Sequence, residues 1–205
     1  MRDLVAVGDS ITNGHGDSMA GVPALGWGQW VADAGDLSYT RYGRGGATSA
    51  EVAAELVPRV RGRYSIALVS VGTNDNLRRV PLADFTRQVH VILERMRETA
   101  DRVAILTVPA STEFSDAIRS AAQQTGATVV DAHLQGGLLM KADGVHPTAL
   151  GHLELADRAT RALNLPPARA LARTGGRVGV GYWARYGAER VRATTKRAAR
   201  TALHR

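Results

Sequence analysis

Short apolar runs alternate with amphipathic segments along most of this chain. Runs rich in β-branched residues and too short for helices predict five strands, at 4–7, 37–42, 66–71, 103–108 and 128–130. Apolar positions at helical spacing predict five helices, near 26–31, 48–57, 81–96, 114–124 and 147–156. Strands that alternate with helices in this way are typical of a parallel sheet covered on both faces.

The expected fold class is therefore α/β, a three-layer α/β/α sandwich with a five-stranded parallel sheet of the flavodoxin-like kind. The chain has 205 residues, which suits one domain with an appendage. We assign residues 1–166 to the body and residues 167–205 to a basic, helical C-terminal extension. Sites in such sheets form beyond the carboxyl ends of the strands, so the residues after each strand are the first candidates.

Charge is distributed unevenly between these two parts. The net charge is +7, but residues 168–205 hold ten Lys and Arg against the single acid Glu189, whereas residues 1–167 hold sixteen basic and eighteen acidic residues. The high isoelectric point therefore belongs to the extension and does not indicate that the body binds nucleic acid. No recognition motif accompanies the charge, and we expect no specific nucleic-acid binding.

Other features of the composition bear on localisation. There is no cysteine, which excludes disulfides, zinc–thiolate sites and thiol catalysis. The first strand follows Met1-Arg2-Asp3 directly, so we expect no signal peptide. No run of about 18 apolar residues predicts a membrane span. The expected location is cytoplasmic, with peripheral attachment at the inner membrane face as an alternative.

The first strand ends in Gly8-Asp9-Ser10, which presents a serine where a nucleophile is commonly held. The same tripeptide recurs at 16–18, but no strand precedes Ser18 and a turn residue explains it. We therefore prefer Ser10 as the nucleophile. A serine hydroxyl needs an adjacent base to take its proton.

Among six histidines, His146 is the preferred base because Asp143, three residues earlier, can turn back and hold its Nδ1. His133, which follows the fifth strand, is a rival. Another explanation is that Asp143 and His146 only cap the helix that begins near Pro147.

Two positions are candidate donors to an oxyanion. Asn74, in Gly72-Thr73-Asn74-Asp75 after the third strand, offers an uncharged side-chain amide. Gly46, in the loop after the second strand, offers a backbone N–H that a substrate can approach closely. Both segments are also typical of plain turns.

In their order, Ser10, Gly46, Asn74 and His146 resemble the SGNH (GDSL-type) hydrolase family. The matching blocks span residues 4–164 and are Gly8–Thr12, Tyr42–Thr48, Gly72–Asp75 and Asp143–Pro147. In the second block, Arg41 stands where the family commonly has Asn, and Gly45 where it commonly has Ser. The Gly-x-Ser-x-Gly elbow of ordinary α/β-hydrolases is absent, which makes that fold the lesser candidate.

The resemblance implies a role for each matching residue. Ser10 would be the nucleophile, His146 the base and then the acid, and Asp143 the residue that orients His146. The oxyanion hole would comprise the amides of Ser10 and Gly46 and the side chain of Asn74. Asp9 and Asp75 would support the site. The family implies neither a metal nor an organic cofactor.

Three functions are compatible with these residues. The first is a serine esterase or lipase-like hydrolase acting on a small-molecule or lipid ester, or on a thioester. The second is an acyltransferase that uses the same site to acylate a sugar or lipid hydroxyl. The third is a non-catalytic scaffold tethered by its basic tail.

The extension carries a separate pattern. From about Tyr182 a helix is expected, with one stripe of mostly small apolar side chains, namely Val180, Trp183, Ala184, Gly187, Ala188, Val191 and Ala198. Arginines lie largely outside this stripe. The pattern is typical of an interfacial helix, so residues 182–205 are a candidate site for an anionic membrane surface. The same pattern would also be expected of a solvated helix packed on the body, or of an arm that docks a partner protein.

Overall fold

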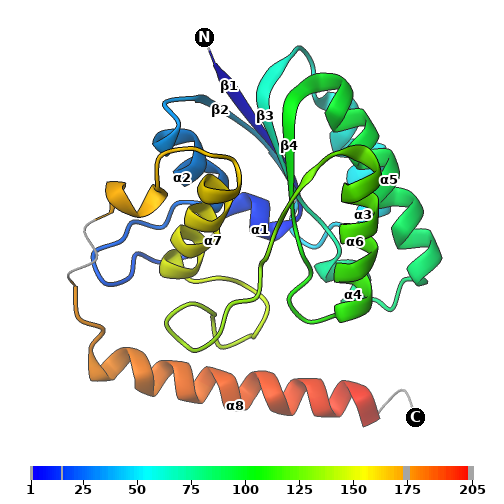
Figure 1. The fold of residues 1–205 in the computed structure, drawn as a ribbon. Helices are drawn as coiled ribbons and strands as arrows, with labels where there is room; N and C mark the ends of the chain where they lie inside the picture. Colours follow the sequence, from blue (N-terminus) through cyan, green and yellow to red (C-terminus); the bar gives the residue numbers. More distant parts are fainter. Residues whose placement is uncertain (1, 15, 173–175, 203–205) are drawn as a thin grey trace.

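The computed structural model describes residues 2–14, 16–172 and 176–202, with side chains described to residue 195. A parallel sheet lies between two layers of helices (Figure 1). Its five strands are β1 (Asp3–Gly8), β2 (Ser38–Gly43), β3 (Tyr64–Ser70), β4 (Ala100–Leu106) and β5 (Thr128–Val130). Their order, β2-β1-β3-β4-β5, is that of a flavodoxin-like sheet. The predicted three-layer fold is confirmed.

Helices cover both faces of the sheet (Figure 1). The α-helices are α1 (Ser10–Asn13), α2 (Trp27–Ala34), α3 (Ser49–Glu51), α4 (Thr73–Leu77), α5 (Leu82–Thr99), α6 (Thr112–Thr125), α7 (Ala149–Ala162) and α8 (Val180–Ala202). Helices α2 and α7 lie on one face, and α3, α5 and α6 lie on the other. The helix expected over 48–57 begins as predicted, at the Thr48 cap, but changes to a π-turn (Val52–Leu56) and a 3₁₀ turn (Val57–Arg59). Pro58 has no N–H, so a regular helix cannot run through it unchanged.

Each face of the sheet carries its own apolar core. On β3, Ile66 and Leu68 face α2 and α7, whereas Ala67 and Val69 face α5 and α6, and all four are fully buried. This explains why the strand reads as a continuous apolar run, since both of its faces are covered. Its neighbour β1 is buried in the same way and ends at Gly8, two residues before Ser10.

Two short helices, α1 and α4, occur outside the five helices that the sequence predicts. They carry Ser10 and Asn74 at the carboxyl edge of the sheet. The Asp9 side chain caps α1 by accepting the Ile11 N–H, and Gly72 enters α4 with φ of 104°. A helix of four or five residues has too few turns to show periodicity, so the pattern could not reveal it.

Beyond α7 the chain continues along the body. A 3₁₀ turn (Ala168–Leu171) packs on α2 and α7, with Ala168 fully buried. Helix α8 then crosses the side of the molecule toward which the parallel strands run (Figure 1). The division after residue 166 stays a prediction. Within the described ranges, no helix has the length and apolar character needed to cross a membrane.

The central position of Leu68 gives a direct test of this packing. We expect Leu68→Ala to lower the free energy of unfolding by about 2–5 kcal/mol, because it opens a cavity between β3 and the covering helices. Leu82→Ala is the control, since Leu82 is 39% exposed, and it should change stability by less than about 1 kcal/mol. Urea denaturation measures both, and equal effects would contradict the packing described.

Candidate active site

The turn that follows β1 presents Ser10 at the edge of the sheet. A side chain at Gly8 would place its Cβ 2.1 Å from the Ser70 carbonyl oxygen on β3, so only glycine lets the two strands approach here. The Asp9 N–H donates to the same carbonyl, at 3.1 Å. Ser10 is then the first residue of α1 and is partly exposed. The close approach of two strands therefore fixes where the hydroxyl lies.

Ser10 belongs to a continuous series of three hydrogen-bonded side chains. Its Oγ lies 2.9 Å from His146 Nε2, and His146 Nδ1 lies 2.8 Å from Asp143 Oδ2. Because the Asp143 carboxylate accepts a hydrogen bond from the Nδ1–H group, Nε2 is left to accept one from the serine hydroxyl. The series can draw a proton from Ser10 and stabilise the imidazolium that results.

The Asp143 carboxylate is held by its own turn. Its Oδ1 accepts the backbone N–H groups of Val145 at 2.8 Å and His146 at 2.9 Å. Burial alone would raise the pKa of Asp143, but the hydrogen bonds from His146 and Val145 outweigh it and lower the pKa to about 2. The group is thus ionised throughout the neutral range. Helix α7 is capped by Thr148, which accepts the Gly151 N–H, and not by Asp143 or His146.

The rival residues lie outside this series. His133 is exposed, and its Nε2 lies 2.7 Å from Gln135 Nε2. Ser18 is exposed in the loop between α1 and α2, on the rim of a hollow shared with α8. Of the described histidines, it is His146 whose ring the structure brings to Ser10.

Asn74 and Gly46 lie on neighbouring segments next to Ser10's strand. One N–H of the Asn74 amide donates to the Ala47 carbonyl at 2.9 Å, which ties α4 to the loop after β2. Gly46 has φ of 76°, and its carbonyl accepts from Arg78 Nη2 at 2.7 Å. Among the described residues, none accepts a hydrogen bond from the Gly46 N–H. That donor and the second Asn74 N–H are the groups an oxyanion could use.

Asp75 on α4 also links α4 to the segment that follows the Gly46 loop. Its buried carboxylate accepts the Ser49 N–H at 2.9 Å and the Ser49 hydroxyl at 2.6 Å. Ser49 begins α3, directly after the loop that holds Gly46. Asp75, which the family resemblance gave a supporting role, thus joins α3 to α4 through Ser49. Its partner Ser49 was missed, because nothing local in the sequence pairs residues 26 apart.

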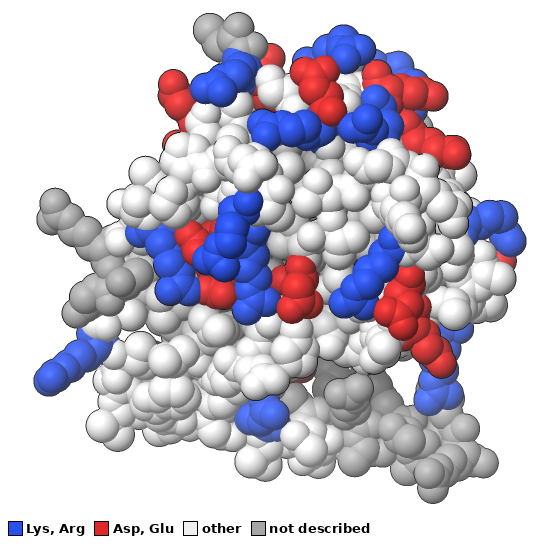
Figure 2. Space-filling view, in the orientation of Figure 1, with Lys and Arg blue, Asp and Glu red and all other residues white. Residues whose placement is uncertain are grey.

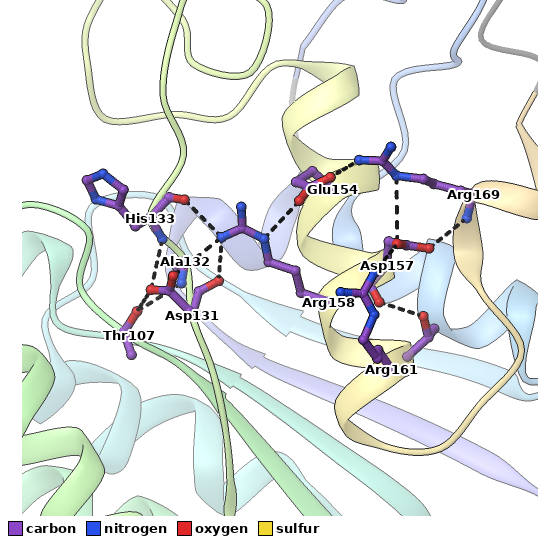
Figure 3. A network of polar contacts seen from close by, with 10 residues as sticks. Thr107, Asp131, Ala132, His133, Glu154, Asp157, Arg158, Arg161 and Arg169 are labelled. Carbon is purple, nitrogen blue, oxygen red and sulfur yellow. Dashed lines mark hydrogen bonds and ion pairs between the residues drawn. The ribbon is translucent and has the colours of Figure 1, made fainter.

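An arginine network anchors the start of the segment that carries Asp143 and His146 (Figure 3). Arg158 on α7 donates to the carbonyls of Asp131 at 3.1 Å and His133 at 2.9 Å, and its Nε donates to Glu154 at 2.9 Å. Asp131 in turn accepts from Thr107 at 3.2 Å. The segment is therefore fastened to both β4 and α7 before it reaches the site. Sequence reasoning did not single out Arg158.

Open space adjoins the Asp143–His146 turn on the side of α8. A hollow of about 310 Å³ is lined in part by Pro109, Met140, Gly144 and Tyr186. It brings together the loops after β4 and β5, so a bound molecule would lie beside the Asp143–His146 turn. Within the described part of the chain, no cluster of three or more His, Asp or Glu side chains could hold a metal ion.

Asp9 is an uncommon feature of this edge, because its carboxyl is wholly buried. Oδ1 accepts from the Ile11 N–H at 2.9 Å and the Ser70 hydroxyl at 3.2 Å, whereas Oδ2 has no hydrogen-bond partner among the described residues. Burial raises the pKa of Asp9 to about 6, although the hydrogen bonds from Ile11 and Ser70 oppose the shift. An ionised carboxylate here costs stability.

This burial predicts a specific dependence of stability on pH. Folded Asp9 binds its proton more tightly than unfolded Asp9, so the free energy of unfolding should fall as the pH rises from about 4 to 6, by up to about 3 kcal/mol from this group. Asp9→Asn should remove that fall and be more stable than the wild type above pH 6, as measured by urea denaturation. The exposed Asp17→Asn is the control. An unchanged profile in Asp9→Asn would contradict the assignment.

Comparison with known proteins agrees with this geometry. The model of the GDSL-like lipase/acylhydrolase family matches residues 6–153, more than two thirds of the chain. The esterase EstA from Pseudoalteromonas sp. shares the fold at 17% identity and a TM-score of 0.62, over 80% of this chain and 97% of its own. TesA does so at 23% identity and 0.61, over 79% and 98%.

A salicylyl-acyltransferase, SsfX3, from a tetracycline biosynthetic pathway also shares the fold, at 17% identity and a TM-score of 0.59, over 80% of this chain and 55% of its own. No curated protein matches. These structures show the common architecture, and the family model decides membership. The chain belongs to the GDSL-like lipase/acylhydrolase family.

Proposed function

We propose that this protein is a serine hydrolase that cleaves a carboxylic ester or thioester through an acyl-serine intermediate. The observation that carries the proposal is the series from Ser10 Oγ through the His146 ring to Asp143, with contacts of 2.9 and 2.8 Å. A serine hydroxyl at this distance from an oriented imidazole is an activated nucleophile. Family membership supports the same class of chemistry.

In the first half-reaction, His146 Nε2 takes the hydroxyl proton as Ser10 Oγ bonds to the acyl carbon. The tetrahedral intermediate then collapses, the bond to the leaving oxygen or sulfur breaks, and Nε2 returns the proton to that atom. Asp143 accepts the Nδ1 N–H throughout and stabilises the positive ring. Since the pKa of Asp143 is about 2, the carboxylate stays ionised while His146 gains and loses its proton.

The negative oxygen of the intermediate would lie between the amides of Ser10 and Gly46 and the second N–H of Asn74. The Ser10 N–H is in the first turn of α1, where a helix supplies no carbonyl partner. Asn74 is held by its contact with Ala47, so its amide is oriented before substrate binds. Donors fixed in advance stabilise the transition state more than donors that must reorient.

In the second half-reaction, His146 activates the molecule that attacks the acyl-serine. Water releases a free acid, whereas a sugar or lipid hydroxyl would carry the acyl group away as a new ester. The SsfX3 neighbour is named an acyltransferase, and its likeness to this chain concerns the fold. We propose that water is the attacking molecule and that the substrate is a small-molecule or lipid ester. Analysis of the products formed with an acceptor present would distinguish hydrolysis from transfer.

Replacement of Ser10 tests the proposal. Ser10→Ala should lower kcat for hydrolysis of p-nitrophenyl esters at least about 10³-fold, because no other group takes the place of the nucleophile. Ser18→Ala is the matched control, since Ser18 stands in the same tripeptide and should keep full activity. Retained activity in Ser10→Ala, or its loss in Ser18→Ala, would exclude Ser10 as the nucleophile.

The orienting role of Asp143 has a separate expectation. Asp143→Asn should keep the fold and lower kcat by roughly 10²–10⁴-fold, because the amide favours the wrong tautomer of His146. Asp101→Asn, an exposed carboxylate at the start of β4, should leave kcat unchanged. If Asp143→Asn changed only KM, Asp143 would belong to substrate binding instead.

A further inference from the structure

Helix α8 holds the segment that carries Asp143 and His146. The Tyr182 hydroxyl donates to the Gly137 carbonyl at 2.5 Å, and a Cβ at Gly137 would lie 2.8 Å from the Tyr186 ring. The rings of Tyr182 and Tyr186 are stacked with centroids 6.0 Å apart. One face of α8, defined by these two tyrosines, is therefore packed on the body.

The opposite face of α8 is apolar and uncovered. Val180, Ala184, Gly187 and Val191 follow one another at intervals of four, three and four residues, so they form one stripe along the helix. Val180 is 87% exposed and Val191 is 68% exposed. Trp183, which the sequence placed in the stripe, is 44% exposed but packs on the body, since a Cβ at Gly137 would lie 2.9 Å from its ring. The side chain of Ala198 lies outside the described residues, so the part of the stripe that faces away from the body is Val180, Ala184, Gly187 and Val191.

The charged side chains of α8 are almost all basic. Arg192 is exposed beside the stripe, whereas Arg185 and Arg190 also line the hollows between α8 and the body. Glu189, the one acid among residues 168–205, lines the same hollow as Arg185. In Figure 2 the described part of the lower edge, where α8 lies, is mostly white with a basic group on it, whereas basic and acidic groups intermingle over the rest of this face.

The helix lies at the catalytic edge of the molecule. Two hollows separate it from the body, and their other walls are the loops that follow β1, β4 and β5 (Figure 1). Tyr186 lines both hollows, and Gly144 of the catalytic turn lines the second. A surface that met the outer face of α8 would therefore lie at the side of the molecule where these hollows border the Asp143–His146 turn.

We infer that α8 binds the surface of an anionic phospholipid membrane through this outer face and holds the catalytic edge against it. An exposed apolar stripe on a helix whose charged side chains are almost all basic suits a layer of anionic headgroups above acyl chains. A second copy of this chain would bring a like-charged extension against the first and is disfavoured. A nucleic acid would leave the exposed apolar stripe without a role.

Vesicle sedimentation tests the inference with the full chain. Binding is expected to phosphatidylcholine vesicles that contain phosphatidylglycerol, to be weak on phosphatidylcholine alone, and to decline with salt. Val191→Asp should lower the partition coefficient at least tenfold, whereas Val91→Asp on α5, where Val91 is 49% exposed, should not change it. Arg185→Gln/Arg192→Gln should lower it roughly 30-fold, and the control Arg2→Gln/Arg61→Gln should lower it far less.

Tryptophan fluorescence gives an independent readout of the same helix. Trp27 and Trp30 are buried, at 0% and 4% exposure, so Trp183 is the tryptophan that lipid can reach. Anionic vesicles with brominated acyl chains should quench part of the emission of the wild type and none of that of Trp183→Phe. Equal quenching of both proteins would overturn the inference.

Other results of these experiments would also decide whether α8 binds anionic membranes. Equal binding to neutral and anionic vesicles, or unchanged binding of Val191→Asp, overturns the inference. A dimer in analytical ultracentrifugation that Val191→Asp dissociates would make the face an interface between copies instead. Because neither readout uses catalysis, failure here leaves the proposed ester hydrolysis untouched, and loss of activity in Ser10→Ala does not bear on lipid binding.

Discussion

The hydrogen bond between Ser10 and His146 joins residues 136 positions apart in the chain. Neither side chain has a local reason to meet the other, so their contact depends on where the sheet ends and how the last segment returns to it. The close approach of β1 and β3 at Gly8 sets one partner. Arg158, by holding the carbonyls of Asp131 and His133, restrains the path to the other. The contact between Ser10 and His146 therefore depends on packing at Gly8 and on the hydrogen bonds of Arg158.

Two buried carboxylates support this edge in different ways. Asp75 receives the N–H and hydroxyl of Ser49 and is well satisfied, so it binds two segments rigidly together. Asp9 has an oxygen without a described partner and a pKa raised to about 6, so it weakens the fold at neutral pH. A destabilised group next to the proposed nucleophile is a common cost of holding a site in a fixed geometry.

The elements visible from the sequence are those whose pattern is local. Strand β5 has the predicted bounds 128–130, and the strand ends correctly place Ser10 and Asn74 on one edge, because buried parallel strands read as apolar runs. Helices α1 and α4 were missed because they are too short to show a period. The contacts of Arg158 were missed because their partners are distant backbone carbonyls. For α8 the apolar stripe was visible, but the direction it faces is set by Tyr186 against Gly137.

Ser10 is the serine that we propose to be activated at this edge of the sheet, and the repeated tripeptide supplies an internal control. A fluorophosphonate bonds covalently to an activated serine, and the EstA neighbour is described as inhibited by monoethylphosphonate. Tandem mass spectrometry of the labelled protein should place the adduct on Ser10 and leave Ser18 unmodified. An adduct on Ser18, or no adduct on either serine, would contradict the account.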